Sequence, residues 1–252
     1  LGAFTDLLYD PAANETAAAF VRGKILALVD DPVTAEALSP HTVIGCKRLC
    51  VASGYYETYN RPNVALVDVG RDSIAGITPA GIEVGGTVHE VDDIVFATGF
   101  DAMTGALDRI DIRGRHGLPL REKWAAGPTT YLGLQVHGFP NLFTITGPGS
   151  PSVLTNMVVS IEQHVEWIAD AVDRLDRDGR ATIEPTPQAE AEWVAYVNAV
   201  AELTLFHGCS SWYLGANVPG KPRVFMPLPG FPEYKERCDQ VAAAGYEGFV
   251  RA

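Results

Sequence analysis

Two adjacent cations stand between apolar residues and cysteines in residues 44–50, IGCKRLC. The chain has 19 Lys and Arg against 31 Asp and Glu, so the pair Lys47 and Arg48 is a local exception. In an extended segment the two side chains point to opposite faces, so that one could contact a phosphate while the other stabilises a negative charge. Two solvated charges, or one ion pair, would explain the same residues. The pattern leaves both interpretations open.

A second stretch, residues 144–157, places glycine and proline between an apolar run and a long helix, with the sequence TITGPGSPSVLTNM. Unpaired backbone N–H groups and the positive end of the helix dipole meet at such a helix start, which suits an anionic ligand oxygen. No GxGxxG motif accompanies it, so a rigid strand-to-helix turn is an equally good interpretation.

A third stretch is the Gly- and Pro-rich loop of residues 210–225, SSWYLGANVPGKPRVF. Trp212 offers one N–H donor on a large apolar ring, and Asn217 offers donors and acceptors. Long loops that look ordered are often functional. A tryptophan taken alone is more often a core residue, so the loop is a candidate site and no more.

Composition limits the classes of protein to consider. The 252 residues are 47% hydrophobic and 20% charged, which predicts a globular chain at the size where one core gives way to two. The net charge of −12 disfavours nucleic acid and anionic membranes as general partners. We find neither an apolar run of membrane-spanning length nor a secretory signal, and therefore expect a cytoplasmic protein.

The cysteines and histidines predict no metal site. Cys46 and Cys50 have no second cysteine pair and no nearby histidine, and the six histidines are scattered. For a cytoplasmic chain we expect Cys46, Cys50, Cys209 and Cys238 to be reduced, structural thiols.

Periodicity predicts helices at residues 10–29, 33–38, 156–177 and 187–205. The third has the clearest apolar face, formed by Ile161, Val165, Ile168, Val172 and Leu175.

Short β-rich runs fall between the second and third of these helices, at residues 63–69, 73–78, 82–84, 87–91, 94–97 and 141–146. The run at 94–97 lies within DDIVFATGFD and has no polar alternation, so we expect a strand buried on both faces, as in a parallel sheet. Gly99 after it would let a backbone or a flat ligand approach closely.

Seven runs of sequence carry a resemblance to a known family. They are GCKR, SGYYETYNRPNV, DIVFATGFDAMTGAL, IDIRGR, YLGLQVHGFPNLFTITGPGSPS, SIEQHVEWI and SWYLGANVPGKP. In this order, over nearly the whole chain, they resemble the C-terminal half of a Baeyer-Villiger monooxygenase and are similar to phenylacetone, steroid and cyclohexanone monooxygenases.

The resemblance implies an α/β chain built from parts of two Rossmann-like dinucleotide-binding domains. Residues 1–43 would end a helical insertion, 44–97 would complete the NADP domain, and 98–252 would complete the FAD domain, with ATGFD as the crossing between them. The family's two GxGxxG motifs and its FxGxxxHxxxWP fingerprint have no counterpart here. The resemblance therefore implies a chain that is inactive without an N-terminal half.

The implied activity is an NADPH-dependent flavin monooxygenase that oxidises ketones to esters or lactones with O2 through a C4a-peroxyflavin. Its cofactors would be FAD and NADP, and its partners the ketone, O2 and the N-terminal half, without nucleic acid, membrane or metal. Two alternatives stay open: a related flavin monooxygenase that oxidises nitrogen or sulfur, and a non-catalytic nucleotide-binding fragment.

The resemblance also implies roles for single residues. Arg48 matches the family's essential arginine beside the flavin, and Lys47 matches a residue near the 2′-phosphate of NADPH. Trp212 matches a tryptophan that reaches NADP through its ring N–H. Asn156 and Met157 match a main-chain contact with the flavin.

Four further residues are implied to line the substrate pocket: Ser152, Val153, Leu154 and Met226. The first three match a bulge that lines the pocket in the family. Val153 and Leu154 could equally be ordinary packing residues.

Overall fold

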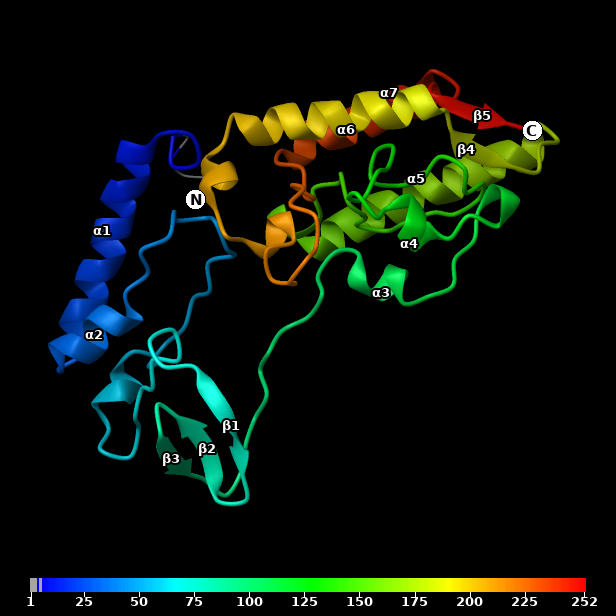
Figure 1. Cartoon of the computed structure of the whole chain (residues 1–252). Coiled ribbons are helices and arrows are strands. Elements are labelled where there is room, and N and C mark those ends of the chain that lie inside the picture. The colour runs from blue at the N-terminus through cyan, green and yellow to red at the C-terminus, as the bar shows by residue number, and fades with distance from the viewer. Residues whose placement is uncertain (1–3, 5) are drawn as a thin grey trace. The chain divides into compact units, whose positions relative to one another are not determined.

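The computed structural model describes residues 4 and 6–252, so residues 1–3 and 5 of the expected helical insertion lie outside the described part. In the described residues the helices are α1 (Pro11–Leu28), α2 (Pro32–Leu38), α3 (Gly105–Asp108), α4 (Leu120–Lys123), α5 (Met157–Arg177), α6 (Pro187–Glu202) and α7 (Phe231–Ala243). The strands are β1 (Ile74–Thr78), β2 (Gly81–Val84), β3 (Thr87–Glu90), β4 (Ile183–Pro185) and β5 (Phe249–Arg251) (Figure 1).

The chain divides into two compact units. The first unit comprises Leu1–Ile44 and Arg48–Gly99, and the second comprises Gly45–Lys47 and Phe100–Ala252. The division separates Lys47 from Arg48, although the two are neighbours in the chain. None of the described helices has both the length and the apolar character needed to cross a membrane.

The helices predicted from the sequence are confirmed as α1, α2, α5 and α6, because each starts at a strong capping signal. Asp10 accepts the N–H of Ala12 at 2.8 Å at the start of α1, and Asp31 accepts the N–H of Thr34 at the start of α2. Thr186 caps α6 in the same way. Proline stands in the first turn of all three, where its missing N–H costs nothing.

In the first unit, β1, β2 and β3 form an antiparallel sheet in that order. These strands confirm the β-rich runs predicted at residues 73–78, 82–84 and 87–91. Buried Asn14 ties α1 to Ile44, donating to the Ile44 carbonyl at 3.0 Å and accepting the Ile44 N–H at 2.9 Å. The same carboxamide donates to the Leu7 carbonyl at 2.7 Å, so its polar atoms are satisfied.

Three expected strands do not form in the described chain. Residues 63–69 and 94–97 have no strand pairing, and residues 141–146 contribute only one isolated bridge, at Phe143. Val95 is 88% exposed and Phe96 is 68% exposed. The prediction that residues 94–97 form a strand buried on both faces is therefore wrong for the described chain. The physical reason is that a parallel strand needs at least one neighbouring strand to pair with, and the described residues form only antiparallel pairs, none of which includes residues 94–97.

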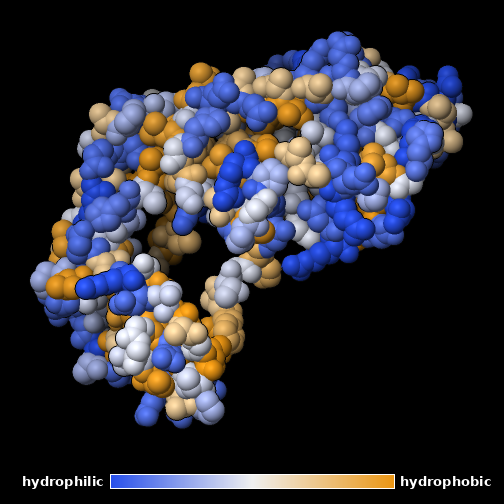
Figure 2. All heavy atoms as spheres, in the orientation of Figure 1, coloured by the Kyte–Doolittle hydropathy of each residue, from blue (hydrophilic) through white to orange (hydrophobic). Residues whose placement is uncertain are grey.

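Gly99 also differs from the expectation. Its φ is +80°, but a Cβ placed there would meet nothing within 4 Å among the described residues. The backbone conformation, and not a close approach, favours glycine at this position. Apolar side chains of the first unit remain at its surface, among them Ile74, Ile77, Val88 and Val91. The space-filling view shows hydrophobic atoms at the molecular surface (Figure 2).

The core of the second unit is an aromatic cluster. Trp167 of α5, Trp193 of α6 and Tyr234 of α7 pack with Tyr131 and with the β4–β5 pair. Each indole N–H finds a backbone carbonyl: Trp167 donates to Cys238 and Trp193 donates to Gly149, both at 3.0 Å. The cluster therefore fixes three helices against one another.

Only part of the apolar face predicted for α5 is buried. Leu175 belongs to the core and Ile168 packs against it, whereas Ile161, Val165 and Val172 are exposed. Trp167 and Ala171 complete the buried face. The apolar arc of α5 is wider than the surface that α7 and the neighbouring loops cover in this chain. Periodicity finds an apolar arc but does not tell which part of it is covered.

A glycine-proline-glycine turn at residues 147–149 leads from the Phe143 segment toward α5. Thr130 donates to the Pro148 carbonyl at 2.6 Å, and Trp193 holds the Gly149 carbonyl. Gly149 has φ +85°, and a Cβ there would lie 2.9 Å from Thr130 Oγ1 and 3.2 Å from Trp193 Nε1. The turn accepts only glycine at this point.

A buried histidine of α5, His164, links the residue before this turn to α7 and to Leu132. His164 Nδ1 accepts the Thr146 N–H at 2.8 Å, so the neutral ring carries its proton on Nε2, which lies 2.8 Å from the Tyr234 hydroxyl. That hydroxyl donates to the Leu132 carbonyl at 2.7 Å. Burial lowers the pKa of His164 from its ordinary value of 6.5 to about 4.

The histidine predicts a pH dependence of stability. Its folded pKa is depressed, so its contribution is complete above pH 6.5 and is lost as the pH falls toward 4. Between pH 7.5 and pH 5 the free energy of unfolding should fall by about 2 kcal/mol more in the wild-type chain than in His164→Gln. Denaturant titrations at the two pH values measure this. The exposed His116→Gln is the control and should keep the wild-type slope; an equal slope in His164→Gln would contradict the assignment.

The turn generates a second prediction. Gly149→Ala should lower the free energy of unfolding by about 1–3 kcal/mol, because the added methyl group meets Thr130 and Trp193 and the left-handed backbone disfavours it. Gly208→Ala is the matched control, since a Cβ at Gly208 meets nothing within 4 Å. Equal stability of the two variants in urea would show that the turn is not constrained as described.

Candidate functional site

The start of α5 brings together five of the residues singled out from the sequence. A short 3-10 helix (Ser152–Leu154) leads into Asn156, which caps α5 by accepting the Val158 N–H at 3.0 Å. Asn156 is exposed and Met157 is half-buried. By helix geometry, the other N–H groups of the first turn have no acceptor within the helix. The start of α5 can therefore receive an electronegative ligand atom.

The residues of the 3-10 helix differ in accessibility. Ser152 is 2% exposed, and its hydroxyl lies 3.6 Å from Met103 Sδ. Val153 and Leu154 are half-buried. Only the latter two can contact a bound molecule directly in the described chain.

Trp212 lies in a second 3-10 helix (Trp212–Leu214), which Ser211 caps by accepting the Tyr213 N–H at 3.1 Å. The indole is half-buried and its ring meets the Tyr213 ring edge-on at 4.5 Å. Among the described residues its N–H has no acceptor, in contrast to the N–H groups of Trp167 and Trp193. Trp212 is thus the indole whose donor is available to a ligand.

Met226 joins the Trp212 loop to the turn before α5. Its N–H donates to the Tyr213 carbonyl at 2.9 Å, and its carbonyl accepts the Gly149 N–H at 2.6 Å. Two residues later, Leu228 donates to the Ser150 carbonyl at 2.7 Å. The side chain of Met226 is buried at 2% exposure, so it supports the site from behind.

Two residues that follow Trp212 in the same loop, Asn217 and Lys221, bind the segment at residues 100–102. Lys221 forms a salt bridge with Asp101 and donates to the Ala102 carbonyl at 3.0 Å. Asn217 donates to the Phe100 carbonyl at 2.7 Å. Opposite charges in ATGFD and in the 210–225 loop were the available signal, but no spacing rule links residues 120 apart.

Lys47 and Arg48 are both exposed. Lys47 belongs to the second unit with Trp212 and Met226, while Arg48 belongs to the first. The described chain therefore brings Lys47, Trp212, Met226 and the start of α5 into one unit, and does not place Arg48 relative to them.

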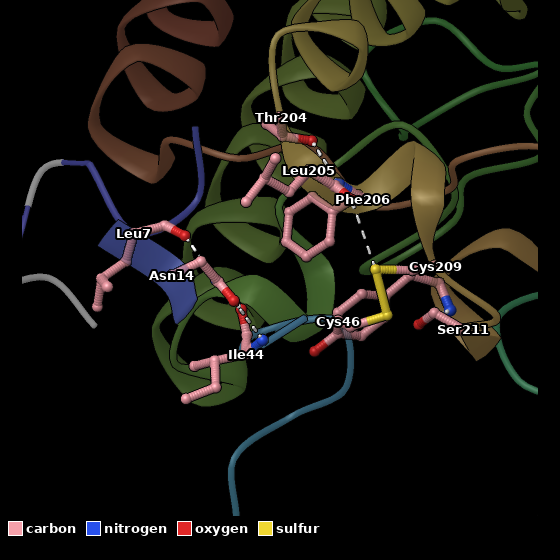
Figure 3. Close-up of a disulfide and its surroundings, with 10 residues drawn as sticks. Leu7, Asn14, Ile44, Cys46, Thr204, Leu205, Phe206, Cys209 and Ser211 are labelled. Carbon is pink, nitrogen blue, oxygen red and sulfur yellow. Dashed lines mark hydrogen bonds between the residues drawn. A yellow bond between two sulfur atoms is a disulfide. The ribbon is translucent and has the colours of Figure 1, made fainter. Parts of the chain in front are cut away.

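The expectation of reduced thiols is wrong for two of the four cysteines. Cys46 and Cys209 form a disulfide with Cα atoms 5.8 Å apart (Figure 3). Cys50 and Cys238 are free. The sequence held no signal for this pair, because 163 residues separate its members. No cluster of three or more metal-ligating side chains occurs in the described residues.

Sequence comparisons relate the chain to curated monooxygenases. It is 42% identical over 252 residues to a Baeyer-Villiger monooxygenase of Pseudooceanicola batsensis, and 43% identical over 254 residues to an acetone monooxygenase (methyl acetate-forming) of Gordonia sp.. Each alignment covers 99% of this chain but only 46% and 48% of the relative. A phenazine N-monooxygenase of Lysobacter antibioticus is 40% identical. No protein-family model matches the chain.

Structural comparisons agree with the sequence comparisons. An oxidised steroid monooxygenase bound to NADP superposes with a TM-score of 0.92 at 55% identity, covering 99% of this chain and 47% of that one. A closed cyclohexanone monooxygenase superposes with a TM-score of 0.95 at 46% identity, covering 100% and 47%. The chain spans about half the length of the relatives it matches, and it is a homologue of the Baeyer-Villiger monooxygenases that corresponds to their C-terminal part.

Proposed function

We propose that the chain is the C-terminal portion of an FAD- and NADPH-dependent monooxygenase that converts ketones to esters or lactones with O2. The observation that carries the proposal is the agreement over the whole chain, at 55% identity, with a steroid monooxygenase bound to NADP. Cyclohexanone monooxygenase structures with bound cyclohexanone and bound caprolactone also match over the full chain. In the proposal, residues 1–43, 44–97 and 98–252 belong to the helical insertion, the NADP domain and the FAD domain.

The flavin would supply the chemistry of the reaction by accepting hydride from NADPH and activating O2. The start of α5 fits a flavin, because its exposed first turn presents backbone N–H groups and a positive dipole end. These would favour negative charge on the reduced ring. Asn156 and Met157 would make this contact through the main chain.

Trp212 would hold NADP through its indole N–H. Its half-buried ring rests on Tyr213, and its donor finds no acceptor in the described chain. The hydrogen bond from Met226 to the Tyr213 carbonyl and the Lys221–Asp101 salt bridge anchor the part of the loop that follows Trp212. The loop is therefore built to present one donor at a fixed position, which is what holding a nicotinamide requires.

Val153 and Leu154 are the better candidates for contact with the ketone, because they are partly exposed. Ser152 and Met226 are buried at 2% exposure and would shape the pocket by supporting its wall. This ranking refines the set of four residues implied by the resemblance.

A second candidate function is oxidation of a ring nitrogen, which the similarity to phenazine N-monooxygenase supports. The product distinguishes the two functions. The chain should be expressed together with the N-terminal half of a steroid monooxygenase relative and given NADPH, O2 and either a ketone or a phenazine. Formation of an ester or lactone supports the proposal, while formation of an N-oxide alone favours the alternative. Neither product in a flavin-containing complex would favour a non-catalytic fragment.

Arg48→Ala should abolish ester formation in the reassembled enzyme while NADPH still reduces the flavin. A guanidinium remains charged and commonly lowers the pKa of a neighbouring acid by about 1–3 units, so its loss should reduce oxygenation by orders of magnitude. Stopped-flow flavin reduction and product analysis measure the two steps separately. The exposed Arg61→Ala is a control from the same unit. Full oxygenation by Arg48→Ala would remove this residue from the mechanism.

Lys47→Ala should raise the KM for NADPH at least about tenfold more than the KM for NADH, because a charge-assisted contact to the 2′-phosphate is worth roughly 1.5–3 kcal/mol. Steady-state kinetics with both coenzymes give the ratio. Lys235→Ala, which removes an exposed lysine of α7, should leave the ratio unchanged. Equal effects of Lys47→Ala on both coenzymes would exclude the phosphate contact.

A further inference from the structure

We propose that Cys46 and Cys209 are a reversible redox modification site, whose disulfide fixes the Trp212 loop to the Lys47 segment and whose reduction releases it. The pair lies within the second unit and joins residues 163 positions apart. Its Cα separation of 5.8 Å lies inside the range of roughly 4.4–6.8 Å that a disulfide spans. The inference rests on this geometry and does not require the proposed function.

The two flanks of the disulfide are the segments that carry the candidate ligand contacts. Cys46 directly precedes Lys47, and Cys209 stands two residues before Ser211, the cap of the Trp212 helix. Between α6 and α7 the chain forms only short 3-10 helices. Hydrogen bonds and the Lys221 salt bridge anchor the later part of this stretch, and the disulfide anchors its earlier part.

The two cysteine residues differ in exposure. Cys46 is 1% exposed, whereas Cys209 is half-buried. The carbonyl oxygen of Leu205 lies 3.5 Å from Cys209 Sγ, so the reduced thiol would have an acceptor already in place (Figure 3). Both redox states are thus accommodated, and a small oxidant or an attacking thiol would reach Cys209.

The chemistry balances with a peroxide as oxidant. One hydrogen peroxide takes two electrons and two protons from the two thiols, giving the disulfide and two water molecules. Two equivalents of an external thiol reverse the step through a mixed disulfide at Cys209. In a reducing compartment such as the cytoplasm expected from the sequence, protein disulfides are usually transient or redox-sensing, which fits a reversible bond.

The other two cysteines are natural controls. Cys50 is exposed and free, and burial raises the pKa of the Cys238 thiol to about 12. Cys238 therefore stays protonated and unreactive at neutral pH. Cys50 is an exposed thiol only four residues from Cys46. It therefore shows whether peroxide links Cys46 to Cys209 or to another accessible thiol.

The first experiment uses the whole 252-residue chain. The chain is reduced with dithiothreitol, desalted and treated with hydrogen peroxide, and its peptides are mapped by mass spectrometry without reduction. We expect loss of two of the four thiols, one linked peptide containing Cys46 and Cys209, and recovery of both thiols with fresh dithiothreitol. A link through Cys50, no link, or irreversible oxidation would overturn the proposal. The mapping needs no variant.

A second measurement tests the restraint on the loop. Hydrogen–deuterium exchange over residues 203–216 should be slower in the oxidised chain, and Tm should rise on the order of 10 °C because the bond closes a long loop in the unfolded chain. Cys50→Ser should keep both differences and Cys209→Ser should lose them. Equal exchange of the oxidised and reduced wild-type chains would overturn the proposal even if the bond forms.

Discussion

The fold of the second unit depends on the turn at residues 147–149. Its carbonyl groups accept from Thr130 and from Trp193 of α6, and the Gly149 N–H donates to the Met226 carbonyl. Through Met226 and Tyr213, the same turn sets the position of Trp212. One left-handed glycine thus links the aromatic core, the start of α5 and the ligand-facing loop, and the geometry of the candidate site follows from it.

A second feature of the chain is the apolar surface that remains exposed. Ile161 and Val165 of α5 are exposed, as are Val95 and Phe96 in the segment before Gly99. Apolar strands of a parallel sheet require partner strands, and the described residues provide none for this segment. The chain spans about half the length of its relatives, and these apolar side chains stay exposed among the described residues.

Features that depend on neighbouring residues in the chain, such as helix starts and short strands, were predicted from the sequence. Caps and proline fixed the starts of α1, α2 and α6, and turn residues set the β1–β3 sheet. The helix α7 was not predicted, because Gly230 at its start offers no side-chain cap and because the sequence of the helix is largely polar. The Cys46–Cys209 bond and the Lys221–Asp101 pair are long-range contacts without a spacing rule, so only the structure reveals them. The residue roles came from the resemblance and remain proposals.

The most direct test of the account is the absorption spectrum of flavin in the reassembled protein. The chain and a complementary N-terminal polypeptide from a steroid monooxygenase relative are mixed with FAD and passed through gel filtration. The account predicts that both polypeptides elute together with yellow, bound FAD, because the start of α5 completes the flavin site. A colourless complex in which the two polypeptides still elute together would contradict it.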